Sequence, residues 1–188
     1  MARVPLARGA AANAAVGALV PPVGFVLRPA AGVVAPAAGV TRSAAADVLT
    51  GEAIGGLVQR AEQLPGDLTD EARLRQLWTN DTSFDQHVKR RIAYGHATSA
   101  AHLAELTFAA LARAQSAQVA LGEYPVTAVE SPGWATLLTQ DGRIKTAYPI
   151  EPDRPSFTDN QRRLGYTVNE SALTERSVQN LARVFGPH

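Results

Sequence analysis

The dipeptide Asp141-Gly142 is the feature of this 188-residue sequence that most constrains its fold. It lies between residues 134–139 and 144–150, two short stretches with the composition of β-strands. Asp-Gly supplies the positive φ angles that a type I′ turn requires, and between two extended stretches it is the strongest local signal for a β-hairpin. We therefore expect an antiparallel hairpin that turns at this dipeptide. Two further short strands are expected at 119–121 and 126–129.

The sequence before these strands has helical periodicity. We expect helices over 44–64, 69–78, 83–95 and 99–114. After the hairpin, residues 151–168 are rich in Pro, Asp and Asn and predict a loop, and a last helix is expected over about 170–185. The order of these elements predicts an α+β fold. N-terminal helices pack on a small antiparallel sheet that ends in the hairpin, and a C-terminal helix follows.

The helix predicted over 83–95 has clear signals at both ends. Ser83 and Gln86 match the capping-box pattern, and Gly95 is a typical helix stop. Phe84, Val88 and Ile92 recur every four residues, so they are expected to form its buried stripe.

The composition changes along the chain and suggests three segments. Residues 1–46 contain no acidic residue and are dominated by Ala, Gly, Val and Pro. This segment has three interpretations: a signal peptide, a translocation or pre-toxin segment, or a flexible linker. Pro21-Pro22 interrupts its uncharged stretch at 9–27, so no stable membrane span is expected. We expect a helical linker region over 47–79 and the α+β domain over 80–188.

Charge and cysteine content exclude some classes of site. The formal net charge is +1, which gives no global reason to expect a polyanionic partner. The sequence has no cysteine, which excludes disulfides and thiolate metal sites. His96 and His102 are six residues apart, off the spacing of a helical metal pair, so His96 is interpreted as a loop residue and His102 as helix surface.

The first candidate for chemistry lies on the helix over 83–95. His87 and Arg91 are four residues apart and share one helix face, beside the apolar stripe. Phosphoryl-transfer chemistry needs a group that titrates near neutral pH and a fixed cation that holds the phosphate. The alternative is a helix with a solvated basic face, to which Lys89 and Arg90 also belong.

The second candidate is the last strand of the hairpin. Strict alternation puts Arg143, Lys145 and Ala147 on one face and Ile144, Thr146 and Tyr148 on the other. Thr146 and Tyr148 are either amphipathic packing residues or hydroxyl donors to a bound phosphate. Trp134 also has two interpretations, a core side chain or a ring that stacks on a base.

The order of elements is a basic helix, a second helix and an antiparallel sheet, and the sheet ends in the hairpin sequence Asp141-Gly142-Arg143-Ile144-Lys145-Thr146-Ala147-Tyr148-Pro149. This combination resembles the barnase–EndoU–colicin–RelE group of nucleases. The resemblance is to the toxin tips of contact-dependent and polymorphic toxin systems and to related domains of phage head proteins, and it covers residues 80–168. It implies a metal-independent ribonuclease without a cofactor, in which the RNA 2′-hydroxyl attacks the adjacent phosphate. RNA, with tRNA among the candidates, is the implied substrate, and a cognate immunity protein is an implied partner.

The resemblance also implies roles for individual residues. His87 matches the helix histidine that acts as general base or acid, and Arg91 matches the helix cation, a role that Lys89 or Arg90 could also fill. Thr146 and Tyr148 match the polar positions of the terminal strand. Arg143 and Lys145 match the residues that contact the phosphate.

Two other functions stay open from the sequence. One is a non-catalytic binding or structural module of the same fold, which the low net charge favours. The other is a secreted protein whose signal peptide is removed. The expected location is accordingly outside the producing cell or in the cytoplasm of a target cell, or in the cytoplasm of the producing cell if the protein is not exported.

Overall fold

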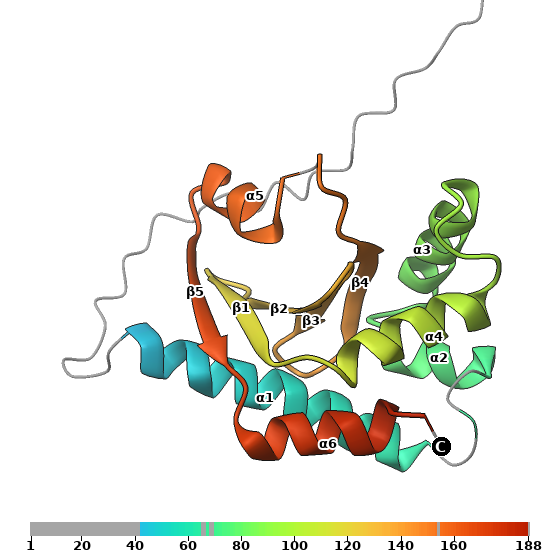
Figure 1. The fold of residues 1–188 in the computed structure, drawn as a ribbon, viewed down its shortest axis with the longest axis horizontal. Helices are drawn as coiled ribbons and strands as arrows, with labels where there is room; N and C mark the ends of the chain where they lie inside the picture. The colour runs from blue at the N-terminus through green and yellow to red at the C-terminus, as the bar shows by residue number, and fades with distance from the viewer. Residues whose placement is uncertain (1–41, 65–66, 68–69, 154, 188) are drawn as a thin grey trace, which may run out of the picture. The chain divides into compact units, whose positions relative to one another are not determined.

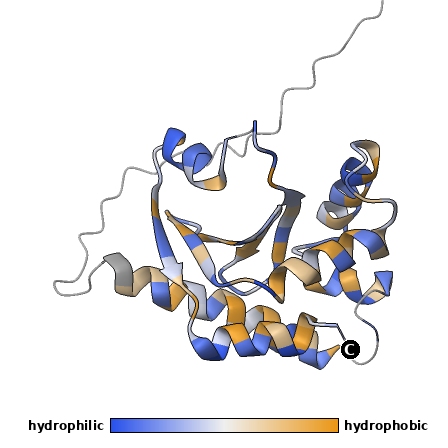
Figure 2. Ribbon diagram, viewed as in Figure 1, coloured by the Kyte–Doolittle hydropathy of each residue, from blue (hydrophilic) through white to orange (hydrophobic). Residues whose placement is uncertain are grey.

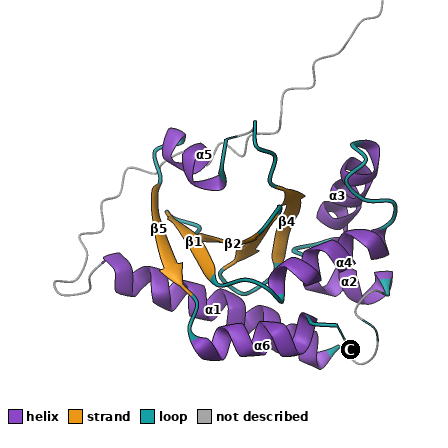
Figure 3. Ribbon diagram, viewed as in Figure 1, coloured by secondary structure: helices purple, strands orange, loops and turns teal. Residues whose placement is uncertain are grey.

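The computed structural model describes residues 42–187 apart from 65–66, 68–69 and 154, and for residues 42–43 it describes the backbone only. These residues belong to one compact unit. Four helices precede four strands, and a helix, a strand and a last helix follow (Figures 1 and 3), which confirms the predicted α+β class. The elements are α1 (Arg42–Gln63), α2 (Glu71–Leu77), α3 (Asp81–Ala93), α4 (Ala100–Leu111), β1 (Ser116–Leu121), β2 (Val126–Ser131), β3 (Trp134–Thr139), β4 (Ile144–Pro149), α5 (Phe157–Arg163), β5 (Thr167–Ala172) and α6 (Glu175–Phe185).

All neighbouring strands of the sheet are antiparallel, in the order β4-β3-β2-β1-β5. Helices α1, α4 and α6 lie on one side of the sheet and α5 lies on the other (Figure 1). Strand register and alternation assign each side chain to one of two faces. The core face carries Val119, Val129, Leu138, Ile144 and Ala147, which are buried in the main hydrophobic core or beside it.

The opposite side of the sheet, which we call the α5 face, is more polar. A small apolar cluster of Ala120, Ala128 and Phe157 attaches α5 to it. In the register, Glu130 of β2, Ala135 of β3 and Tyr148 of β4 form one row across this face, and Thr146 lies in the next row beside Leu137. Figure 2 shows α5 as a largely hydrophilic helix, whereas hydrophobic residues are frequent along α1 and α4.

The hairpin tip packs directly against α1. A Cβ atom at Gly142 would lie 2.2 Å from the Leu57 amide nitrogen, and one at Gly56 would lie 2.6 Å from the Asp141 carbonyl oxygen. Arg60 donates to the Asp141 carboxylate over 3.0 Å. The glycine at each position therefore permits a backbone-to-backbone contact that no larger residue allows.

The predicted hairpin is confirmed, but its turn is not type I′. Among the described residues only glycines have a positive φ, so Asp141 lacks the left-handed conformation that a type I′ turn requires, whereas Gly142 has φ 79°. The Gly142 amide donates to the Thr139 carbonyl and the Thr139 amide donates to Arg143. These bonds define a three-residue loop in which a type I turn is followed by one left-handed glycine.

A β-bulge in β4 changes the faces expected from strict alternation. Leu137 pairs with Thr146 and Leu138 pairs with Ile144, so Lys145 is an extra residue between them. Ile144 therefore shares the core face with Ala147, and only Thr146 and Tyr148 stay together on the α5 face. The prediction that Ile144 lies with these two residues was wrong, because alternation does not allow for the bulge.

The helix over 83–95 was predicted with the wrong start, and its buried stripe was correct for Phe84 and Val88 but wrong for Ile92. The cap is Asn80, whose side chain accepts from the Ser83 amide, so α3 begins at Asp81. Phe84 is buried, but Ile92 is 43% exposed and Arg91 is only 8% exposed. Arg91 is buried in place of Ile92 because α3 packs against the edge of β4, where Arg91 Nε donates to the Ala147 carbonyl. The stop at Gly95 is confirmed by its φ of 72°.

Two elements occur where the sequence predicted a loop and the start of a helix. Helix α5 lies within the predicted loop at 151–168, and β5 replaces the first residues of the helix predicted over 170–185. Strand β5 pairs with β1 along its whole length, but its exposed polar residues do not give the sequence pattern that predicts a strand. The predicted helix start at Thr69 and the segment 1–41 lie outside the described residues.

The boundary predicted near residue 80 does not divide the described residues. Ile54 and Leu57 of α1 and Leu74 and Leu77 of α2 belong to the same core cluster as the sheet. The region predicted as a helical linker over 47–79 is therefore part of the folded unit.

Gly56→Ala is expected to lower the free energy of unfolding by about 1–3 kcal/mol, because the added methyl group separates α1 from the hairpin tip. Gly55→Ala is the matched control, since a Cβ at Gly55 meets nothing within 4 Å. It removes a flexible residue from an exposed helix position and should raise the stability by about 0.5–1 kcal/mol. Urea unfolding measures both free energies. Equal changes in the same direction for the two variants would show that Gly56 is not packed more closely than Gly55.

Candidate functional site

The outer edge of β4 is covered by α3 and by the residues before it. Trp78 forms a parallel bridge with Ile144, and the Thr79 amide donates to the Ile144 carbonyl over 3.1 Å. Further along the strand, Arg91 Nε donates to the Ala147 carbonyl over 2.9 Å. These contacts satisfy backbone groups that an edge strand otherwise leaves unpaired.

His87 lies beside Thr146 at this edge. Its Nδ1 is 3.2 Å from the Thr146 hydroxyl, and its ring centroid is 5.3 Å from that of Trp78. Burial, followed by the charges of Arg91 and Arg90, lowers the pKa of His87 to about 4. His87 is consequently neutral at pH 7, so it can donate or accept a hydrogen bond with Thr146 according to its tautomer, but it is not an imidazolium that could act as a general acid.

Arg91 and Tyr148 form the second pair at the edge. The guanidinium carbon lies 5.7 Å from the centre of the Tyr148 ring, a cation–π arrangement. Burial, followed by the charge of Glu130, raises the pKa of Tyr148 to about 12, although Arg91 acts in the opposite direction. The Tyr148 hydroxyl therefore stays protonated at neutral pH and can donate a hydrogen bond.

Glu130 is a site residue that the sequence analysis missed. It shares the row of Tyr148 on the α5 face, with only the methyl group of Ala135 between them. Its pKa is raised by burial and by the charge of Glu170 on β5. The available signal was an acidic residue directly after the strand expected over 126–129, a polar residue on a strand of the same kind as Thr146 and Tyr148 on β4.

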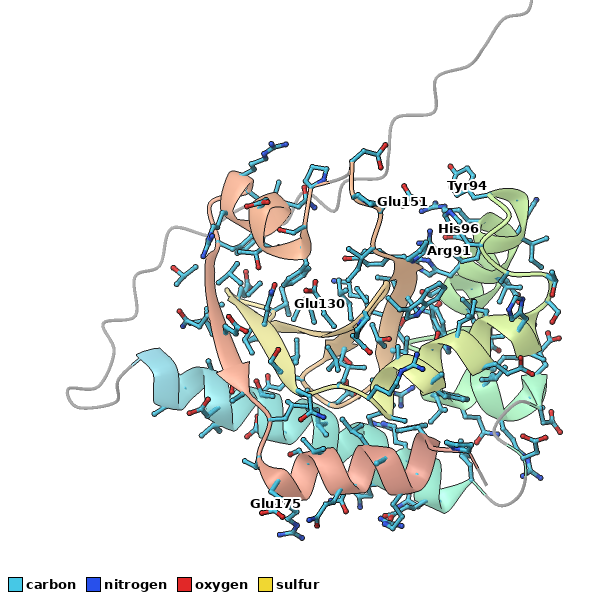
Figure 4. The ribbon with its side chains drawn as sticks, viewed as in Figure 1. Arg91, Tyr94, His96, Glu130, Glu151 and Glu175 are labelled. Carbon is cyan, nitrogen blue, oxygen red and sulfur yellow. The ribbon has the colours of Figure 1, made fainter. Side chains whose placement is uncertain are left out.

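A histidine–carboxylate pair lies at the far end of β4. His96, in the loop between α3 and α4 as expected, contacts Glu151 through Nε2 over 3.1 Å. Figure 4 shows Arg91, His96 and Tyr94 at the α3 side of the sheet, Glu151 above β4 and Glu130 toward the middle of the sheet. The pair connects the α3–α4 loop to the segment that leads from β4 to α5.

The remaining predicted site residues do not join the β4 edge cluster, which we define as His87, Arg91, Glu130, Thr146 and Tyr148. Lys89 and Arg90 are exposed on α3. Arg143 contacts the Asp141 carboxylate over 3.1 Å at the hairpin tip, and Lys145 lines a pocket there.

Trp134 is 7% exposed and belongs to the main core, where its ring is covered and cannot stack on a base. His102 caps its own loop, because its Nδ1 accepts from the Thr98 amide over 3.1 Å.

The described part of the chain contains no group of three or more His, Asp or Glu side chains placed to hold a metal ion. None of the helices within it is long and apolar enough to cross a membrane.

A family model described as "Uncharacterised protein aq_aa01" matches residues 69–186. The chain belongs to this family. The matched residues include every strand of the sheet and all members of the β4 edge cluster. The comparison with curated proteins gave no match to the chain, and the comparison with solved structures gave none either.

The low pKa of His87 predicts a specific dependence of stability on pH. The unfolded chain binds a proton at His87 near pH 6.5 and the folded chain near pH 4, so lowering the pH between these values favours unfolding. The contribution of His87 to stability is thus complete above pH 6.5 and declines toward pH 4. Urea unfolding of His87→Gln between pH 7 and pH 4 should show a smaller loss of stability than the unsubstituted protein. Identical pH profiles would show that His87 is not buried as described.

Proposed function

We propose that this domain is a metal-independent ribonuclease of the bacterial toxin type, which cleaves RNA through attack of the 2′-hydroxyl on the adjacent phosphate. The proposal is based on two pairs of side chains, each formed between a residue of α3 and a residue of β4. His87 with Thr146 and Arg91 with Tyr148 lie side by side along β4, and Glu130 lies two strands away in the row of Tyr148.

The cluster contains the groups that such a reaction needs. Glu130 is a carboxylate whose raised pKa makes it a better base than an exposed glutamate. Tyr148 supplies a hydroxyl that stays protonated, and Arg91 supplies a fixed positive charge. Glu130 and Tyr148 lie on strands two apart, about 10 Å between backbones, on either side of the buried Ala135.

The proposed reaction proceeds in one displacement at phosphorus. Glu130 takes the proton of the 2′-hydroxyl, the 2′-oxygen forms a bond to phosphorus, and the bond from phosphorus to the 5′-oxygen breaks. The 5′-oxygen leaves with the proton of Tyr148, and the products are a 2′,3′-cyclic phosphate and a 5′-hydroxyl. Neutral His87 fixes the Thr146 hydroxyl toward the phosphate, and the Arg91 charge stabilises the extra negative charge of the transition state.

The toxin assignment also implies a substrate, a partner and a location for the protein. RNA, with tRNA among the candidates, is the substrate, and an immunity protein protects the producing cell. The protein is secreted or delivered into the cytoplasm of a target cell. These proposals depend on the resemblance of residues 80–168 to toxin tips, and the β4 edge cluster lies within that range.

A second candidate function is a non-catalytic binding module. The observation that favours it is the position of Arg91, which is 8% exposed and donates its Nε to a backbone carbonyl. On this view, Arg91 and His87 serve to close the edge of β4, and the sheet binds a partner without chemistry.

The test is cleavage of a mixed-sequence RNA by the full chain in the presence of a metal chelator. We expect cleavage, with products that end in a cyclic phosphate. Glu130→Gln removes the base and Tyr148→Phe removes the donor, and each should lower kcat/KM by about 10²–10⁴-fold. His87→Ala should also abolish activity while the domain stays folded at pH 7, because Thr146 loses its partner.

Glu105→Gln on the exposed side of α4 is the matched control and should cleave RNA at the unsubstituted rate. Thermal unfolding of every variant separates lost chemistry from lost folding. Intact RNA after incubation with folded, unsubstituted protein would refute the ribonuclease proposal and leave the binding module.

A further inference from the structure

A pocket lies at the hairpin end of the sheet, and none of the β4 edge cluster residues lines it. Its volume is about 590 Å³, within the range typical of small-ligand sites. It is lined by Glu52, Glu123, Tyr124, Pro125, Val126, Thr139, Gln140, Asp141 and Lys145. No step of the proposed reaction uses this pocket.

The pocket is lined by one lysine and by three carboxylates. Lys145 is the extra residue of the β4 bulge, and its half-buried side chain lines the pocket. Of the carboxylates, Glu52 is held by Gln140 over 2.9 Å and Asp141 is held by Arg60 over 3.0 Å. Within the described residues, no hydrogen bond or ion pair engages Glu123.

The apolar part of the pocket suits a flat ligand. Tyr124 is 62% exposed in the turn between β1 and β2, beside Pro125 and Val126. An exposed aromatic ring next to a polar rim is the usual arrangement for stacking on a nucleobase. Such rings bind bases of single-stranded RNA without regard to sequence, so any selectivity must come from the polar groups.

Strand β4 contributes residues both to the pocket and to the β4 edge cluster. Lys145 directly precedes Thr146, and Tyr148 is three residues further, about 10 Å along an extended strand. A phosphate that links a nucleotide in the pocket to the one at Glu130 and Tyr148 would pass the Lys145 ammonium group. The Lys145 ammonium group can form an ion pair with this phosphate, a common kind of contact between proteins and the nucleic-acid backbone.

We propose that this pocket binds a base with an exocyclic amino group, in the nucleotide next to the cleaved phosphodiester. The inference rests on the proposed ribonuclease function and gives it a preference among substrates. The base stacks on Tyr124, and its amino group donates to the Glu123 carboxylate. Uracil has a carbonyl oxygen where cytosine has the amino group, and that oxygen faces the carboxylate unfavourably.

Cytosine and uracil form a matched pair of ligands because they differ at this position and have nearly the same size. The first measurement is the cleavage rate of oligocytidylate and oligouridylate by the full chain. We expect at least about a tenfold preference for oligocytidylate. Glu123→Ala should reduce this preference to less than about threefold, whereas Glu105→Ala, the matched exposed control, should keep it.

The second measurement does not depend on catalysis. Calorimetric titration of the full chain with cytidine and uridine monophosphates should give tighter binding of the cytidine compound, and Glu123→Ala should remove the difference. Absence of RNA cleavage together with this binding preference would refute the ribonuclease proposal and support the pocket. Equal binding and equal cleavage of the two bases would overturn the pocket assignment while the ribonuclease proposal stands.

Discussion

The contact between the backbones of Gly56 and Gly142 is the constraint on which the arrangement of this domain depends. It brings the hairpin tip against the middle of α1, where Arg60 holds Asp141 through both its carbonyl and its carboxylate. With the tip fixed, the register of β3 and β4 fixes the bulge at Lys145, and the bulge determines which side chains face α5. The contact of the hairpin tip with α1 is therefore linked, through the bulge, to the side chains that the polar face of the sheet presents.

The parts of the fold that follow from local chemistry could be predicted from the sequence. Asp141-Gly142 predicted the hairpin, Gly95 predicted the end of α3, and periodicity predicted α1 and α4. β5 could not be predicted because its exposed polar residues lack an alternating pattern, and it is stabilised by pairing with β1. The face of α3 was misplaced for a similar reason, since the edge of β4 selects Arg91 over Ile92 for burial.

The candidate site could be predicted in part. The pairing of His87 with Thr146 and of Arg91 with Tyr148 agrees with the two constellations that the sequence suggested, and Arg143 and Lys145 lie apart from them at the hairpin end. Glu130 was missed because its relevance depends on register, which places it in the row of Tyr148. Trp134 was ambiguous because a strand in isolation does not reveal which of its faces is buried.

The proposed ribonuclease function requires RNA to bind the α5 face of the sheet at the β4 edge cluster. Binding at this face can be followed by nuclear magnetic resonance of the full chain during titration with a 2′-O-methyl RNA, which lacks the attacking hydroxyl. We expect the amide signals of Glu130, Thr146 and Tyr148 to shift with increasing RNA, while those of buried residues between α1 and α6 stay constant. Shifts confined to the helices of the core face, or no shifts at all, would contradict it.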